Sequence, residues 1–73
     1  MSEQEVKALA DSADLIVNGY AYTKLGDNIR SFNLCNGHAT LFTADREVSE
    51  TSMDDIDLAM ALRYLIENEQ FLE

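Results

Sequence analysis

The sequence predicts a single small α+β domain over residues 1–73: a short N-terminal helix, a three-stranded antiparallel meander, and a long C-terminal helix packed on one sheet face. Three observations support this fold class. Apolar residues near the N-terminus recur at helical spacing, the middle holds strand-forming runs separated by turn residues, and the tail lacks glycine and proline. An apolar content of 47% is normal for a folded protein, and a chain this short accommodates one core.

The N-terminal segment carries a helix-start signal. Ser2 and Glu5 have the S-x-x-E spacing of a capping box, in which two side chains satisfy free backbone N–H groups. Apolar residues follow at helical spacing and predict a helix over about residues 3–13. Residues 15–17 fit either a continuation of this helix or a strand. Gly19 fits both alternatives, as a helix stop or as a turn glycine.

The middle of the chain predicts the meander. Its three strand-forming runs cover residues 20–25, 29–34 and 38–44. Residues 26–28 have turn chemistry, and Asn36–Gly37 is the strongest hairpin signal because both loop positions need positive φ.

The tail predicts a helix from Met53 to about Gln70, capped by Thr51 or Ser52. A helical wheel gives it two apolar stripes. The first, expected to face the sheet, comprises Leu58, Ala59, Leu62, Leu65 and Ile66. The second stripe comprises Ile56, Met60 and Tyr64, with Phe71 close to it.

The second stripe is the predicted interaction site: Ile56, Met60, Tyr64 and Phe71. An outward-facing helix surface is ordinarily polar, so a second apolar stripe needs an explanation. Two explanations stay open at this point. The N-terminal helix covers the stripe within the chain, or a second copy or another protein covers it.

Cys35 and His38 are the only cysteine and histidine in the chain. A two-residue Asn36–Gly37 loop would place them opposite each other on the flanking strands. A thiol nucleophile also needs an orienting group, an oxyanion donor and a pocket, and structural zinc takes four ligands. We therefore predict a turn here, with no catalytic, cofactor-binding or metal-binding residues. A small enzyme or metal protein using this pair is the least favoured alternative.

The charge pattern bears on the partners. The net charge is −9, and residues 45–73 carry nine acidic side chains against two arginines. Phosphate contacts need clustered lysine and arginine, so direct binding to nucleic acid or to an anionic membrane is not expected. The sequence has no apolar run of the roughly 18 residues that a membrane span requires. The acidic first residues do not form a signal peptide, and a single cysteine gives no internal disulfide, so the cytosol is the expected compartment.

These observations together predict a non-enzymatic acidic protein-interaction module without a cofactor. Its expected partner is a protein or a second copy of the chain, and the expected assembly is a dimer formed through the second stripe. The alternative binding role is an acidic mimic of nucleic acid that inhibits a basic protein.

Overall fold

The computed structural model describes residues 13–72, which form five strands followed by a helix and a short 3-10 helix. The elements are β1 (Leu15–Val17), β2 (Tyr20–Leu25), β3 (Asn28–Asn33), β4 (Ala39–Phe42), β5 (Val48–Thr51), α2 (Asp55–Asn68) and η1 (Glu69–Leu72).

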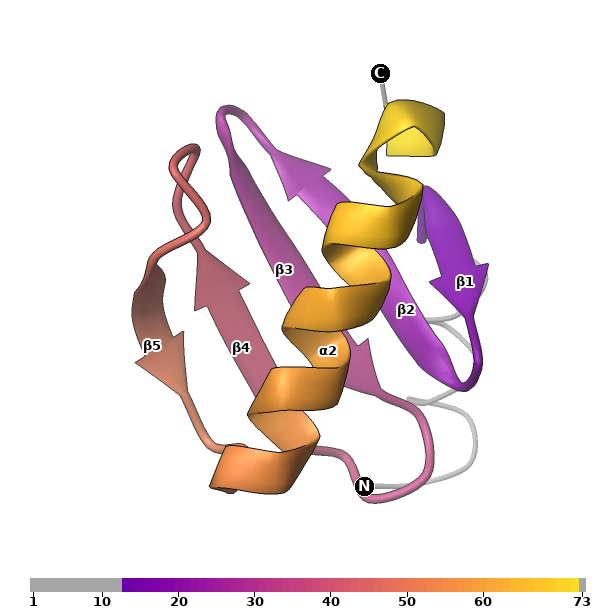
Figure 1. Ribbon diagram of the computed structural model, residues 1–73, viewed down its shortest axis with the longest axis vertical. Helices are drawn as coiled ribbons and strands as arrows, with labels where there is room; N and C mark the ends of the chain where they lie inside the picture. Colours follow the sequence, from indigo (N-terminus) through magenta and orange to yellow (C-terminus); the bar gives the residue numbers. More distant parts are fainter. Residues whose placement is uncertain (1–12, 73) are drawn as a thin grey trace.

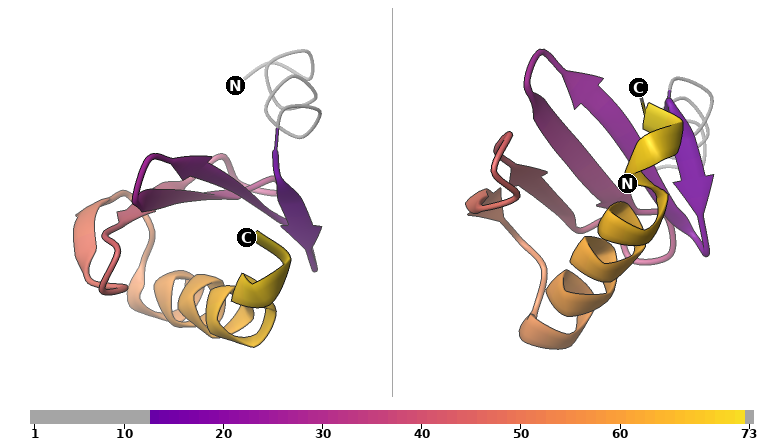
Figure 2. Two further views of the ribbon diagram at one scale, coloured as in Figure 1. Left: turned by 90° about the horizontal axis from the view of Figure 1, so that it is seen from above. Right: turned by 45° about the horizontal axis from the view of Figure 1, so that its top comes forward.

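The strands form one antiparallel sheet in the order β1-β2-β3-β4-β5, and α2 crosses one side of it (Figure 1). Viewed from above, α2 and η1 lie on the same side of the sheet (Figure 2). The α+β architecture is confirmed, but the three-stranded meander is wrong because the sheet has five strands. The helix predicted over about residues 3–13 lies, apart from Ala13, outside the described residues.

The first strand missing from the predicted meander is β1. Asn18 and Gly19 form a two-residue loop in which both φ angles are positive, 49° and 85°. Positive φ at both loop residues is characteristic of a type I′ turn, whose twist matches that of the flanking strands. Val17 therefore pairs with Tyr20, and residues 15–17 are a strand. Three consecutive apolar residues carry no periodicity that separates helix from strand.

The second missing strand is β5, which the sequence presents as a polar stretch leading into the helix. All four of its residues are exposed, so no alternation of apolar and polar side chains marks it. Contacts with β4 hold it instead: the Thr40 and Thr51 hydroxyls hydrogen bond at 2.6 Å. The ladder extends one residue further, where Ser52 N–H donates to the Ala39 carbonyl.

The core lies between the sheet and α2. It is formed by buried side chains from both layers: Tyr20, Tyr22, Ile29, Phe42, Met53, Ala61, Leu65 and Leu72. Half-buried apolar residues from β1 and α2 close its margins: Leu15, Val17, Leu58, Met60, Leu62 and Tyr64. Alternation along the strands puts one set of side chains toward the helix and the other toward the opposite side, where Ala21 and Phe32 are buried.

The sheet-facing line of α2 differs from the predicted one. Asp57, Ala61 and Leu65, spaced four residues apart, are its buried residues. Leu65 of the predicted sheet-facing stripe is buried as predicted, whereas Asp57 and Ala61 lie between the two stripes, so each stripe contributes a half-buried flank. Ala59 and Ile66, assigned to the sheet-facing stripe, are exposed.

Two tyrosines on β2 explain this rotation of the helix. The Tyr22 hydroxyl donates to the Ala61 carbonyl oxygen at 2.7 Å, and the Tyr20 hydroxyl donates to the Asp57 carboxylate. A buried tyrosine needs a polar partner for its hydroxyl. The helix therefore turns its small and polar residues, Ala61 and Asp57, toward these rings.

Candidate functional site

The most connected polar group in the described residues is the Asp57 carboxylate in the first turn of α2. Tyr20 and Asn33 are cross-strand neighbours on β2 and β3, and both donate to Oδ1 of Asp57. Asn36, in the loop after β3, donates to Oδ2 at 3.1 Å. Three segments distant in sequence therefore meet at one side chain that is only 8% exposed.

The electrostatics of this cluster favour an ionised carboxylate beside a protonated phenol. Burial raises the pKa of Asp57, but the hydrogen bonds donated by Tyr20, Asn36 and Asn33 outweigh it and hold the pKa below its ordinary value. Burial, followed by the hydrogen bond to Asp57, raises the pKa of Tyr20 to about 12. The Tyr20 hydroxyl therefore acts as a hydrogen-bond donor at neutral pH.

This arrangement suits a structural clamp. The carboxylate already accepts three side-chain hydrogen bonds, while Asp54 caps the helix by accepting the Asp57 N–H at 2.7 Å. A general base needs a carboxylate oxygen that is free to accept a proton from a bound substrate within hydrogen-bond distance. Asp57 was not among the predicted site residues. An aspartate inside the apolar arc of a helix is the signal that identifies such a buried, hydrogen-bonded group.

Cys35 and His38 lie in the loop between β3 and β4, which is longer than predicted. β3 ends at Asn33 and β4 begins at Ala39, so the two-residue Asn36–Gly37 loop is wrong. The Asn33 side chain accepts the Cys35 N–H at 2.8 Å, and the Asn36 side chain accepts the His38 N–H at 2.9 Å. These bonds stabilise a five-residue loop instead.

Cys35 and His38 form no hydrogen bond with each other; their backbone N–H groups bond to Asn33 and Asn36. Cys35 is exposed to solvent. Within residues 13–72, no group of three or more histidine, cysteine, aspartate or glutamate side chains is placed to hold a metal ion.

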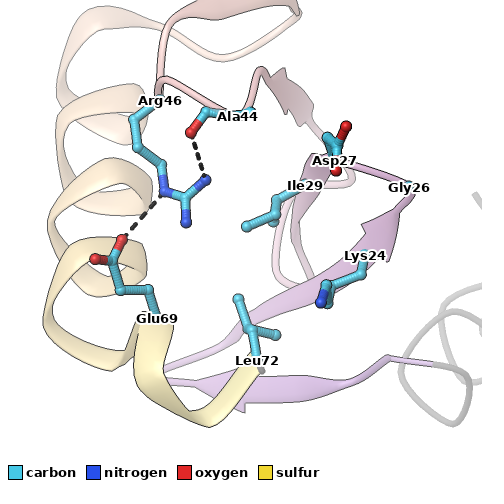
Figure 3. A pocket seen from close by; sticks show the side chains of 8 residues that line it. All are labelled: Lys24, Gly26, Asp27, Ile29, Ala44, Arg46, Glu69 and Leu72. Atoms are coloured by element: carbon cyan, nitrogen blue, oxygen red, sulfur yellow. Dashed lines mark hydrogen bonds and ion pairs between the residues drawn. The ribbon is translucent and has the colours of Figure 1, made fainter.

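A pocket of about 270 Å³ lies where the β2–β3 turn, the β4–β5 turn and η1 approach one another (Figure 3). Arg46 reaches across it to Glu69, with Nε and Oε2 3.2 Å apart, and its Nη1 donates to the Ala44 carbonyl. The other charged lining residues are Lys24 and Asp27. With two cations and two acids, the pocket has no charge preference for a ligand.

The predicted interaction residues divide into two pairs. Met60 and Tyr64 are half-buried against the core of their own chain, and the Tyr64 ring centroid lies 5.8 Å from that of Tyr20. Ile56 and Phe71 are 79% and 61% exposed. The same outward side of α2 also exposes Ile66, at 54%.

Ile56, Ala59 and Ile66 follow one side of α2 at spacings of three and seven residues, and we name this set the outer helix surface. Arg63 lies within it and pairs with Glu67. Two isoleucines are thus exposed on one side of α2, with Arg63 and Glu67 beside them.

Comparison with models of known protein families gives a match over most of the chain. Residues 3–72 match the model of a family of unknown function, DUF7723. The protein belongs to this family. No curated protein and no solved structure matches the sequence, so the DUF7723 assignment carries no activity or ligand with it. No helix within residues 13–72 combines the length and the apolar character needed to cross a membrane.

Proposed function

We propose that this DUF7723 protein is a non-enzymatic acidic interaction module of the cytosol that self-associates through the outer helix surface. The observation that carries the proposal is the exposure of Ile56 and Ile66 on one side of α2. The contact surface is displaced from the predicted stripe, because Met60 and Tyr64 pack into the core. Phe71 in η1 adds a third large exposed apolar side chain beyond the helix.

The energetics favour a weak, reversible dimer. Fully burying an isoleucine or phenylalanine side chain contributes about 1.5–3 kcal/mol. A symmetric contact buries each of these side chains once in each of the two copies, so each contribution counts twice. Association itself costs about 4–15 kcal/mol. The net charge of −9 on each copy opposes association further. Added salt screens this repulsion, so the dimer tightens as ionic strength rises.

Light scattering over a range of protein concentrations tests the proposal. The wild type is expected to show a dimer whose fraction grows with concentration and with salt. An Ile56→Glu, Ile66→Glu double variant is expected to remain monomeric with an unchanged unfolding midpoint, because both side chains are exposed.

A Leu25→Glu, Val48→Glu double variant provides the matched control, since it adds the same two acids at exposed apolar residues outside the outer helix surface. It is expected to preserve the dimer. A wild-type protein that stays monomeric at every concentration and salt level contradicts the proposal, and so does a double variant that dimerises as the wild type does.

A further inference from the structure

The free edge of β5 is a second surface with the properties of a binding site. Within residues 13–72, β5 is the last strand of the sheet and pairs only with β4 (Figure 1). All of its residues are exposed. Because Ser52 N–H points inward to the Ala39 carbonyl, alternation turns the N–H of Thr51 outward. Such a row of open backbone groups is a template for another strand.

β5 has some of the protections usual for an edge strand and lacks others. Protein edges are commonly blocked by short length, by a β-bulge, by proline, by lysine or by an inward-pointing charge. β5 is four residues long, and its register with β4 is irregular. β5 has the sequence Val-Ser-Glu-Thr, with neither proline nor lysine, and Glu50 is its one charged residue. Val48 is 44% exposed.

A groove of about 420 Å³ adjoins this edge. Its lining comes from four strands and from Ser52, which follows β5: Leu25, Arg30, Ala39, Thr40, Leu41, Glu50, Thr51 and Ser52. The register aligns Arg30, Leu41 and Glu50 in one row across β3, β4 and β5. That row lies on the side of the sheet away from α2, since Ser31 and Thr40 occupy the intervening helix-facing positions.

The charges around the edge specify the chemistry of the occupant. Five exposed acids surround β5: Asp45, Glu47, Glu50, Asp54 and Asp55. Arg46 is the one cation between residues 45 and 55, and it is paired with Glu69. Arg30 lines the groove on β3, two strands away from the edge. A second copy would bring the same acids against this edge, and like charges placed opposite each other are destabilising. A basic segment would meet opposite charge.

We propose that the β5 edge binds an extended basic segment of another protein by strand addition. Backbone hydrogen bonds to β5 supply the common part of the affinity. A lysine or arginine beside Glu50 supplies charge complementarity on the side of the sheet away from α2, and its neighbours in the peptide point to the other side. Neither contact involves the outer helix surface, so this site operates whether or not the protein dimerises.

A peptide titration followed by the backbone amide signals of the isotopically labelled protein tests the site. The probe is a short peptide in which lysine and valine alternate. It is expected to shift the amide signals of residues 48–51, to slow hydrogen exchange at Thr51, and to bind less tightly as salt rises.

Two controls separate strand addition from attraction between charges. The same peptide with alternate amides N-methylated keeps its charge but loses hydrogen bonds, and is expected to bind about tenfold more weakly. Glu50→Lys is expected to weaken binding, whereas Glu67→Lys makes the same charge change on α2 and is expected to weaken it less. Equal binding of the methylated peptide, equal effects of the two variants, or shifts confined to α2 would overturn the proposal.

The dimer-deficient Ile56→Glu, Ile66→Glu variant separates this site from the proposed self-association. It is expected to bind the basic peptide as the wild type does. Loss of peptide binding in this variant would place the site on the helix and refute the β5 assignment. An alternating glutamate–valine peptide that binds as well as the lysine peptide would refute the charge requirement.

Discussion

The side chain of Asn36 donates from Nδ2 to Oδ2 of Asp57, across 21 positions in sequence, and so joins the β3–β4 loop to the first turn of α2. Asn36 also accepts the His38 N–H within its own loop. One residue therefore sets the loop conformation and attaches the loop to the helix. The Asp57 carboxylate is the common end point of this contact and of the bonds from Tyr20 and Asn33.

Asp57→Ala is expected to lower the free energy of unfolding by about 2–3 kcal/mol, because hydrogen bonds to a charged group are lost and a buried tyrosine hydroxyl loses its partner. Urea denaturation measures the change. Asp55→Ala, an exposed neighbour in the same helical turn, is expected to cost less than about 1 kcal/mol. Equal losses in the two variants would show that the cluster does not stabilise the fold.

Acid is expected to remove the contribution of Asp57 to the free energy of unfolding. Its pKa is lowered in the folded protein from an ordinary value of 3.8, so its stabilisation is complete above that value and falls as pH drops through the lowered pKa. Unfolding of wild type and Asp57→Asn at a series of pH values measures the effect. The difference in unfolding free energy is expected to shrink below about pH 4. A difference that stays constant down to strongly acidic pH would contradict the lowered pKa.

Ser31 and Thr40 are directly opposed on β3 and β4, and both are fully buried. Within residues 13–72 the Ser31 Oγ has no hydrogen-bond partner, whereas Thr40 bonds to Thr51. Ser31→Ala is therefore expected to be neutral or to stabilise by up to about 1 kcal/mol. Thr40→Val is expected to destabilise by about 0.5–1.5 kcal/mol, because its hydrogen bond to the exposed Thr51 is lost while Thr51 still accepts the Met53 N–H. Thermal unfolding of both variants measures the two changes in stability. A Ser31→Ala variant less stable than Thr40→Val would show that Ser31, and not Thr40, makes the stabilising hydrogen bond.

Gly19 is the second residue of the β1–β2 turn and has φ of 85°. A Cβ at this position meets no atom within 4 Å, so the cost of a substitution is that of the backbone alone. Gly19→Ala is expected to destabilise by about 1–2 kcal/mol. Gly19→Asn is expected to cost less, because asparagine tolerates positive φ. Denaturation midpoints compare the two. An alanine variant as stable as wild type would rule out the strained turn.

Local sequence determined the elements that carry a strong periodic or turn signal. The 20–25 and 29–34 runs correspond to β2 and β3, and the glycine- and proline-free tail corresponds to α2. The predicted helix cap, Thr51 or Ser52, was wrong. Asp54 caps the helix, while Thr51 and Ser52 hydrogen bond to residues of β4. The exposed strand β5 lacked a signal, because a strand with no buried face shows no alternation.

The rotation of α2, and with it the candidate contact surface, was decided by tertiary structure. The sequence by itself determined that the helix has apolar side chains around most of its circumference and that the chain is strongly acidic. It did not determine which arc faces the sheet, because that depends on the hydroxyl groups of Tyr20 and Tyr22, which need partners at Asp57 and Ala61. Those bonds turn Met60 and Tyr64 toward the core and leave Ile56 and Ile66 in solvent.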